Sequence, residues 1–220
     1  MKIDPECLAY WYLRLNGFLT ITNFLVHAET KRDRSTEVDI LAVRFPFRAE
    51  NLTRPMIDDK IFTEHGERIC LVIAEVKSGR CELNGPWRDP KARNMEKVLA
   101  AIGMLPQSCM RTVADSLYQS GYFQDDKHLL SLLCIGRYPN EALLDSLSLV
   151  HQVTFDHMLR FIHGRLVEYL NVKVQHEQWD RDGKALWDTV NSNPGIEDFL
   201  RVVCVGNMEC STNGRLEKGQ

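Results

Sequence analysis

Residues 69–79 of the chain are ICLVIAEVKSG, an apolar run that ends in charged residues. Residues 37–43, EVDILAV, form a second run of the same kind. Short runs rich in valine and isoleucine and bounded by polar residues are typical of buried β-strands. Charged side chains are rarely buried without a partner, because an unpaired buried charge costs several kcal/mol. The carboxylates and the amine at the ends of these runs are therefore candidate functional groups.

The two runs place three charged groups where they can meet. Side chains alternate across a strand, so Glu75 and Lys77 point the same way while Val76 packs behind them. If the two strands are neighbours, Asp39 converges with Glu75 and Lys77. Two carboxylates and one amine can hold a hard divalent cation and a nucleophilic water. The alternative is an edge strand whose charges are solvated or paired in ordinary salt bridges.

This constellation resembles the active site of the PD-(D/E)XK nuclease superfamily, which has the restriction-endonuclease-like fold. The matching residues are Asp39 and Glu75-Val76-Lys77, with Glu6 on a preceding helix, and no proline stands beside the aspartate. The resemblance covers residues 1–138, and it implies an α/β fold whose core has the order αβββαβ. A mixed central sheet flanked by helices is expected for this core.

Periodicity and helix-end signals predict a similar order of elements. Asp4-Pro5 starts a helix that Asn16-Gly17 ends, and Asp89-Pro90 starts another that Gly103 ends. The remaining predicted core elements are strands at 18–27, 37–43 and 69–79, a helix at 107–120, and a strand at 129–135.

The C-terminal part of the chain has a different pattern. Thr154 is predicted to cap an amphipathic helix, and residues 139–210 are expected to form a helical extension packed on the core. Residues 211–220 are polar and contain glycine, and we expect them to be a disordered tail.

The resemblance implies a role for each site residue. Asp39 and Glu75, with the Val76 carbonyl, would bind Mg²⁺ or Mn²⁺, and Lys77 would orient or deprotonate the attacking water. Glu6 would be an auxiliary ligand, although an acid in the first turn of a helix is also favoured by the helix dipole. The expected activity is that of a Mg²⁺-dependent deoxyribonuclease, an endonuclease rather than an exonuclease. Its products would carry a 5′-phosphate and a 3′-hydroxyl.

Basic residues near the second predicted helix are candidate contacts to nucleic-acid phosphates. They are Arg88, Lys91, Arg93 and Lys97. A solvated polar helix face explains the same pattern and is favoured. Trp87 can stack on a base or anchor its loop, and anchoring is the preferred interpretation.

Bulk composition leaves a second function class open. The formal net charge is -3, so the chain has no global basic signature for nucleic acid. The alternative is a non-catalytic nuclease-fold module that binds nucleic acid or a protein partner, and a third possibility is an accidental match. The seven cysteines are odd in number and irregularly spaced, which favours reduced thiols in the cytoplasm. We expect no membrane contact, and a homodimer or a partner protein is possible.

Overall fold

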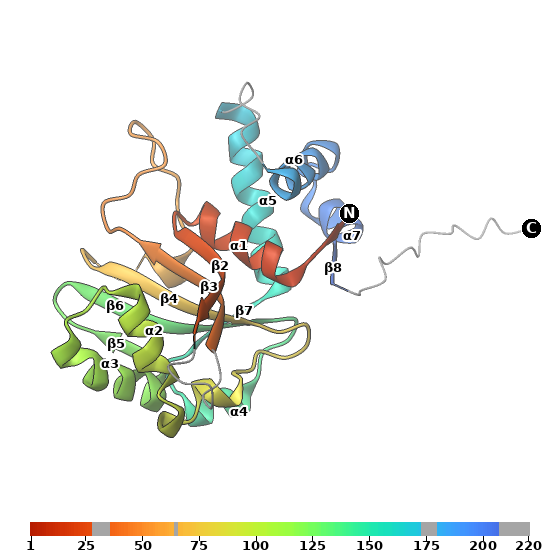
Figure 1. Cartoon of the computed structure of the whole chain (residues 1–220). Coiled ribbons are helices and arrows are strands. Elements are labelled where there is room, and N and C mark those ends of the chain that lie inside the picture. The colour runs from red at the N-terminus through yellow and green to blue at the C-terminus, as the bar shows by residue number, and fades with distance from the viewer. Residues whose placement is uncertain (28–35, 64–65, 173–179, 207–220) are drawn as a thin grey trace, which may run out of the picture.

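The computed structural model describes residues 1–27, 36–63, 66–172 and 180–206, and within them the fold is α/β (Figure 1). A mixed sheet is formed by β2 Leu19–Val26, β3 Thr36–Arg44, β4 Ile69–Val76, β5 Tyr122–Gln124, β6 His128–Gly136 and β7 His151–Thr154. Its strand order is β2-β3-β4-β6-β5, and β7 pairs with β6 off that path. Two further strands, β1 Lys2–Ile3 and β8 Cys204–Val205, form a separate parallel pair.

Strand directions follow from the connections. β3 is antiparallel to both β2 and β4, whereas β4 and β6 are parallel and joined through helices. Nearly every residue of β4 and β6 is buried, because both faces of these central strands are covered. This explains why residues 69–76 are continuously apolar instead of alternating with polar residues.

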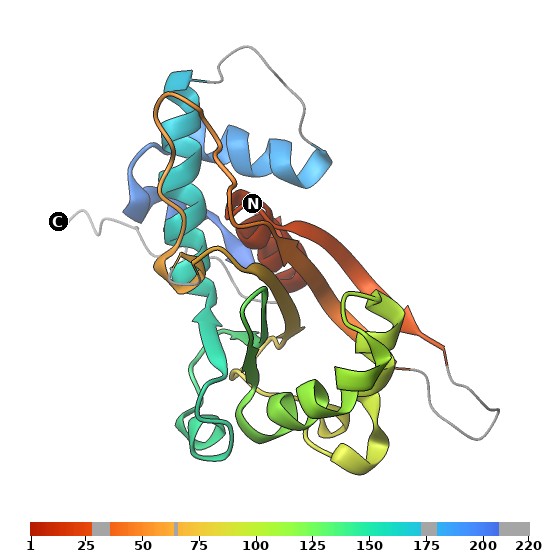
Figure 2. The ribbon, with the colours of Figure 1, turned by 90° about the vertical axis from the view of Figure 1, so that its left-hand side faces the viewer.

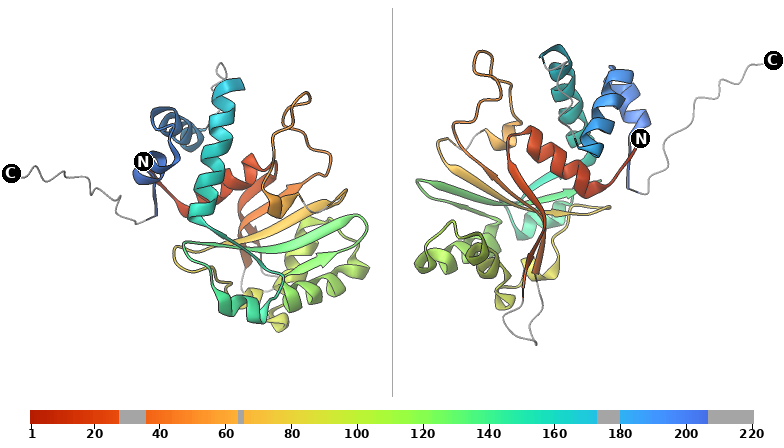
Figure 3. Two further views of the ribbon diagram at one scale, coloured as in Figure 1. Left: turned by 180° about the vertical axis from the view of Figure 1, so that it is seen from behind. Right: turned by 45° about the horizontal axis from the view of Figure 1, so that its top comes forward.

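Helices cover both faces of the sheet. They are α1 Pro5–Leu15, α2 Asn94–Ile102, α3 Gln107–Ser120, α4 Glu141–Ser146, α5 Phe155–Val172, α6 Arg181–Ser192 and α7 Ile196–Val202. Helices α1 and α5 lie on one face and α2 and α3 on the other, as two perpendicular views show (Figures 1 and 2). Helices α6 and α7 lie beside α5, on the side away from the sheet's centre (Figure 3).

The two layers enclose two separate apolar clusters. Val72 of β4 packs in the cluster with α1 and α5, and its neighbour Ile73 packs in the cluster with α2 and α3. This alternation is the usual consequence of the strand pleat. The predicted α/β class, with a mixed sheet flanked by helices, is confirmed.

Sequence signals at the start of the chain correctly predict α1. Asp4 caps the helix by accepting a hydrogen bond from the Glu6 backbone N–H at 2.9 Å, and Pro5 is the first helical residue. Asn16 is the C-cap, and Gly17 follows with a φ of 82°. A left-handed φ of this kind favours glycine, so the chain can turn sharply into β2.

The predicted start of the helix after β4 is wrong. Asp89 caps only a short 3₁₀ helix, Pro90–Ala92, and Arg93 then adopts a left-handed φ of 53°. Helix α2 begins at Asn94, whose buried side chain donates to the Pro86 carbonyl and accepts from the Thr36 hydroxyl. These tertiary contacts fix the start of the helix, and only its end at Gly103 agrees with the sequence prediction.

The three positively charged side chains of Arg88, Lys91 and Arg93 therefore lie before α2, and only Lys97 lies on it. Lys91 and Arg93 therefore lie outside the helix on which they were predicted, and the contacts of the four residues to phosphates stay a prediction.

The C-terminal part adds strands that the sequence pattern did not predict. Strand β7 pairs with β6 in parallel, and β8 pairs with β1 at the other end of the chain. Thr154 does cap α5, since its hydroxyl accepts from the His157 backbone N–H at 3.3 Å. The expected disordered tail at 211–220 lies outside the described residues.

Among the described cysteines, the prediction of reduced thiols does not hold for Cys204. Cys204 is disulfide-bonded, whereas Cys70, Cys81 and Cys134 are buried free thiols. Sequence spacing could not predict this, because disulfide formation depends on the distance between two sulfur atoms in the fold.

A cluster of ion pairs ties the segment after β3 to α5. Asp58 is buried and pairs with three arginines: Arg44 at 2.8 Å, Arg48 at 2.9 Å and Arg165 at 2.9 Å. The Arg165 side chain is only 1% exposed, and it also donates to the Ile57 carbonyl at 2.7 Å. The cluster thus joins β3, the segment that follows it and α5.

Candidate active site

Two adjacent strands bring the predicted carboxylates together. In the antiparallel pair of β3 and β4, Ile40 pairs with Ala74, and this is the last pair of the ladder at that end. Asp39 and Glu75 are the next residues along the two strands. The site therefore lies at the carboxyl end of β4, where regular pairing with β3 stops.

Beyond the end of the ladder, the Asp39 side chain replaces a backbone carbonyl of β3 as the acceptor for β4. Its Oδ2 accepts a hydrogen bond from the Val76 backbone N–H at 2.7 Å. This bond fixes the carboxylate against the strand that carries Glu75 and leaves the second oxygen outside the contact. The Val76 N–H thus contacts Asp39. The role of the Val76 carbonyl as a metal ligand stays a prediction.

The sheet is irregular beside Asp39. Val38 packs with α2 and α3 and Ile40 packs with α1 and α5, although regular alternation would place both on one face. Asn23 of β2 lies between the pairs Thr22–Ile40 and Phe24–Val38 and has a left-handed φ of 51°. Such irregularities in strands are frequent next to functional sites, and the sequence pattern gave no sign of this one.

Glu75 is held by two donors. Its Oε1 pairs with Lys77 Nζ at 2.5 Å, and its Oε2 accepts from Trp87 Nε1 at 2.8 Å. The prediction that Glu75 and Lys77 point the same way is confirmed. Trp87 is buried and anchors its loop to the carboxylate, as its preferred interpretation required.

Burial raises the pKa of the Glu75 carboxyl above its ordinary value of 4.5. The hydrogen bond from Lys77 opposes this change, and the negative charge of Asp39 adds to it. The net direction is upward because Glu75 is only 2% exposed, so its charged form loses much of its hydration. The two carboxylates are close in the fold, because Asp39 accepts from the N–H of Val76, the residue after Glu75.

Glu6 brings a third carboxylate from α1. Its pKa is raised, first by burial and then by the negative charges of Asp39, Asp4, Glu37 and Glu75. Glu6 thus lies within electrostatic reach of both predicted metal ligands, although it belongs to a different element. Its place in the first turn of α1 is also favoured by the helix dipole, and its role as an auxiliary ligand stays a prediction.

The four basic candidates lie near the loop that Trp87 anchors. Arg88, Lys91 and Arg93 are exposed, and Lys97 is partly buried. Arg93 pairs with Glu96 at 3.4 Å, a contact on the protein's own surface. No contact between these four cations and the site carboxylates is found in the described part of the chain.

Carboxylate oxygens are suitable ligands for a hard cation, but the described side chains do not provide a complete coordination shell. Among the described residues, no three His, Cys, Asp or Glu side chains are grouped so that they could hold a metal ion. Mg²⁺ commonly binds through one or two carboxylates and completes its shell with waters and substrate phosphates, so a pair of carboxylates suffices. An ion at Glu75 would compete with Lys77 for Oε1, because both Glu75 oxygens accept hydrogen bonds.

Replacing Glu75 with glutamine is expected to raise the free energy of unfolding of the metal-free protein at neutral pH. Because the pKa of Glu75 is raised on folding, its ionised form destabilises the folded state above that pKa. Below the unfolded pKa the carboxyl is protonated in both states, and this cost disappears. Glutamine still offers an oxygen to Trp87 Nε1, and Lys77, whose side chain is 27% exposed, can turn to solvent.

Urea unfolding of wild type and Glu75→Gln in EDTA, from about pH 4 to about pH 8, measures this difference. The stability gain should be small at the acidic end and grow as the pH rises. Glu37→Gln on the same sheet is the control, since this side chain is exposed and little gain is expected. A gain that does not change with pH would contradict the interpretation.

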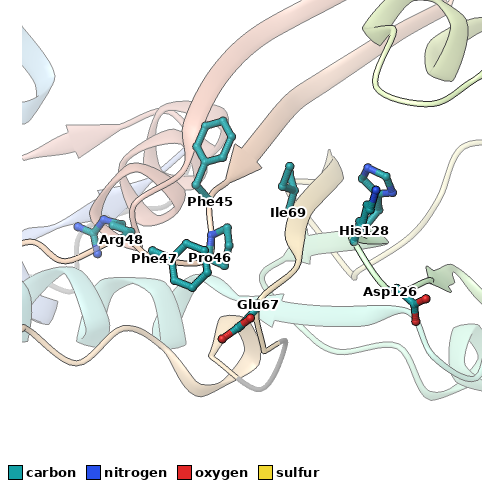
Figure 4. Close-up of a pocket in the computed structure, with 9 residues that line it drawn as sticks. Phe45, Pro46, Phe47, Arg48, Glu67, Ile69, Asp126 and His128 are labelled. Carbon is teal, nitrogen blue, oxygen red and sulfur yellow. The ribbon is translucent and has the colours of Figure 1, made fainter.

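Two cavities lie at opposite ends of the strands. One has a volume of about 610 Å³ and is lined by Phe45 after β3 and by Ile69 and His128 at the starts of β4 and β6 (Figure 4). Glu75 lies six residues further along β4, roughly 20 Å away at strand spacing, so this cavity is not part of the carboxylate site. The other, of about 540 Å³, is lined by Ser78 and Gly79, directly after Lys77.

Comparison with models of protein families, with curated proteins and with solved structures finds no match to this chain. In the described residues, no helix has both the length and the apolar character needed to cross a membrane.

Proposed function

We propose that the protein is a metal-dependent nuclease of the PD-(D/E)XK kind, which hydrolyses phosphodiester bonds in DNA as an endonuclease. The observation that carries the proposal is the arrangement at the carboxyl end of β4, where Asp39 binds the Val76 N–H and Glu75 pairs with Lys77, with Glu6 of α1 within electrostatic reach. These residues come from α1, β3 and the end of β4, so their meeting does not follow from closeness in sequence.

The order of elements supports a restriction-endonuclease-like core. Along the chain, α1 is followed by β2, β3 and β4, then by α2 and α3, and later by the central strand β6. The site lies where β3 and β4 separate, so its groups can face a substrate outside the sheet. Fold order alone establishes no activity, and the argument for catalysis rests on the side chains.

Each residue has a role that its contacts support. Asp39, fixed by the Val76 N–H, and Glu75 would hold Mg²⁺ or Mn²⁺, with Glu6 as an auxiliary carboxylate. The bound ion supplies charge neutralisation at the phosphate and lowers the pKa of a water molecule. Lys77 would orient this water and stabilise the negative charge that develops during hydrolysis. Products with a 5′-phosphate and a 3′-hydroxyl are part of the proposal.

The test measures cleavage and metal binding separately. Supercoiled plasmid and short single- and double-stranded DNA are incubated with wild type in Mg²⁺, Mn²⁺ or EDTA, and Mn²⁺ binding is followed by calorimetry. We expect cleavage in either metal and none in EDTA. Asp39→Asn should lose Mn²⁺ binding and cleavage but remain folded, because asparagine can still accept from the Val76 N–H. Metal-independent cleavage, or wild-type levels in Asp39→Asn, would contradict the proposal.

One observation favours a second candidate, a non-catalytic module that binds nucleic acid or a protein. Both Glu75 oxygens are already paired, with Lys77 and with Trp87, which is how a carboxylate in a purely structural role is satisfied. This candidate predicts neither metal binding nor cleavage by wild type. The two functions therefore give opposite results in the same experiment.

A further inference from the structure

The second cavity continues the candidate site beyond Lys77. Its walls include Ser78 and Gly79 after β4, Arg137 and Tyr138 after β6, and Asp4 at the start of α1. The two strand ends are fastened to each other, since Lys77 N–H donates to the Ile135 carbonyl at 2.9 Å and Arg137 N–H to the Gly79 carbonyl at 2.6 Å. Backbone hydrogen bonds therefore hold together the two segments that follow β4 and β6 and line the cavity.

A glycine makes this close approach possible. A Cβ at Gly136 would come within 2.8 Å of the Cys81 backbone nitrogen and 2.9 Å of the Gly79 carbonyl oxygen. Real Cβ atoms do not approach backbone atoms so closely, so any other residue would push the two segments apart. The backbone of the next residue, Arg137, is thus positioned precisely beside the loop that follows Lys77.

The side chain of Arg137 has no ionic partner in the part of the chain that the structure describes. Its guanidinium makes no ion pair or hydrogen bond within the described residues, and its Nε is buried without a partner. A buried N–H without an acceptor is costly, and a planar guanidinium is well suited to phosphate oxygens. Arg137 lines the cavity and is partly exposed, so the outer nitrogens of its guanidinium, and not the buried Nε, are the donors for phosphate oxygens there.

Tyr138 provides an apolar surface next to this charge. Its side chain lines the same cavity and is 57% exposed. Exposure of a large aromatic ring to water is unfavourable, so a ligand that covers the ring would be stabilised. Aromatic rings on the surface of nucleic-acid-binding proteins stack on bases without regard to sequence. A ligand with a phosphate for Arg137 and a base for Tyr138 is a nucleotide.

Asp4 is the carboxylate among the described residues of the cavity wall, and its charge is already used at the start of α1. It caps α1 by accepting from the Glu6 N–H, where the positive end of the helix dipole compensates it. It makes no ion pair with Arg137 in the described part of the chain, so the guanidinium stays available.

We propose that this cavity is a nucleotide-binding subsite, in which Arg137 binds a backbone phosphate next to the bond that is cut and Tyr138 stacks on the attached base. The inference rests on the proposed function for the identity of the substrate, but it concerns binding and not cleavage.

Binding can be measured without any cleavage. Fluorescence anisotropy in EDTA, over a range of salt concentrations, gives the affinity of the full chain for labelled single-stranded DNA and for an abasic phosphodiester chain of equal length. Arg137→Met should weaken binding of both ligands and reduce the slope of log affinity against log salt by about one. Tyr138→Leu should weaken binding of DNA by roughly ten-fold and leave the abasic chain unchanged.

Two controls separate the subsite from the general surface. Arg111→Met removes an exposed arginine of α3, and Phe47→Leu removes an aromatic side chain that is 78% exposed at the other end of the sheet. Losses in Arg137→Met and Tyr138→Leu that exceed those of the controls would support the subsite, even if the protein cuts nothing. Equal losses in variant and control would overturn it, even if the nuclease activity is real. No binding of either ligand by wild type would overturn it as well.

Discussion

Replacing Lys77 with methionine is expected to slow DNA cleavage by about 10²- to 10⁴-fold, or roughly 3 to 5 kcal/mol of transition-state stabilisation. The ammonium lies at the end of β4 and contacts Glu75 Oε1, so it stands next to the proposed metal ligands. Methionine keeps a long aliphatic chain but cannot donate a proton or stabilise negative charge. Since the Lys77 side chain is 27% exposed, its removal should not unfold the protein.

The measurement is a single-turnover rate at saturating DNA with Mg²⁺, together with DNA affinity in Ca²⁺. The rate should fall while the affinity changes little, because Lys77 acts on the transition state and not on substrate binding. Lys60→Met is the matched control, since Lys60 is an exposed lysine of a 3₁₀ helix outside the site, and its rate should equal that of wild type. A Lys77→Met rate within a few fold of wild type would remove Lys77 from the mechanism.

Asp58→Ala should lower the free energy of unfolding by about 3 to 5 kcal/mol, the usual effect of removing one partner from a buried ion pair. Asp58 binds Arg44, Arg48 and Arg165, and the Arg165 side chain is 1% exposed. Without the carboxylate, Arg165 keeps its positive charge in the interior, where it still donates to the Ile57 carbonyl at 2.7 Å. The exposed Glu168 carboxylate, 4.0 Å from Arg165 Nε, offsets the lost hydration less well than the buried Asp58.

Thermal and urea unfolding give the size of this effect, which corresponds to a melting temperature lower by roughly 10 °C for a chain of this length. Asp156→Ala is the control, because Asp156 also pairs with an arginine but its side chain is 62% exposed. An exposed pair contributes at most about 1 kcal/mol, so this variant should be close to wild type. Equal losses in the two variants would show that burial of the cluster is not what makes Asp58 important.

Local signals along the chain were sufficient for much of the architecture. Asp4-Pro5 predicts the start of α1, and the apolar run before Glu75 predicts β4, because capping and burial on both faces leave a direct trace in the residue types. The predicted start of α2 was wrong. Asp89-Pro90 begins a short 3₁₀ helix, and the buried contacts of Asn94 determine where the α-helix begins. Strand β7 was missed because four residues paired with β6 are too short a run to recognise by periodicity.

Within the site, too, local sequence patterns and tertiary contacts determine different features. The sequence by itself determined that Glu75 and Lys77 share one side of a strand end, because a two-residue period needs no knowledge of the rest of the chain. Tertiary structure decided that Asp39 binds the Val76 N–H, that Trp87 holds Glu75, and that Arg137, unpaired among the described residues, lies beside the loop after Lys77. These contacts join residues from different elements, and their geometry depends on strand order and helix packing, which local residue patterns do not encode.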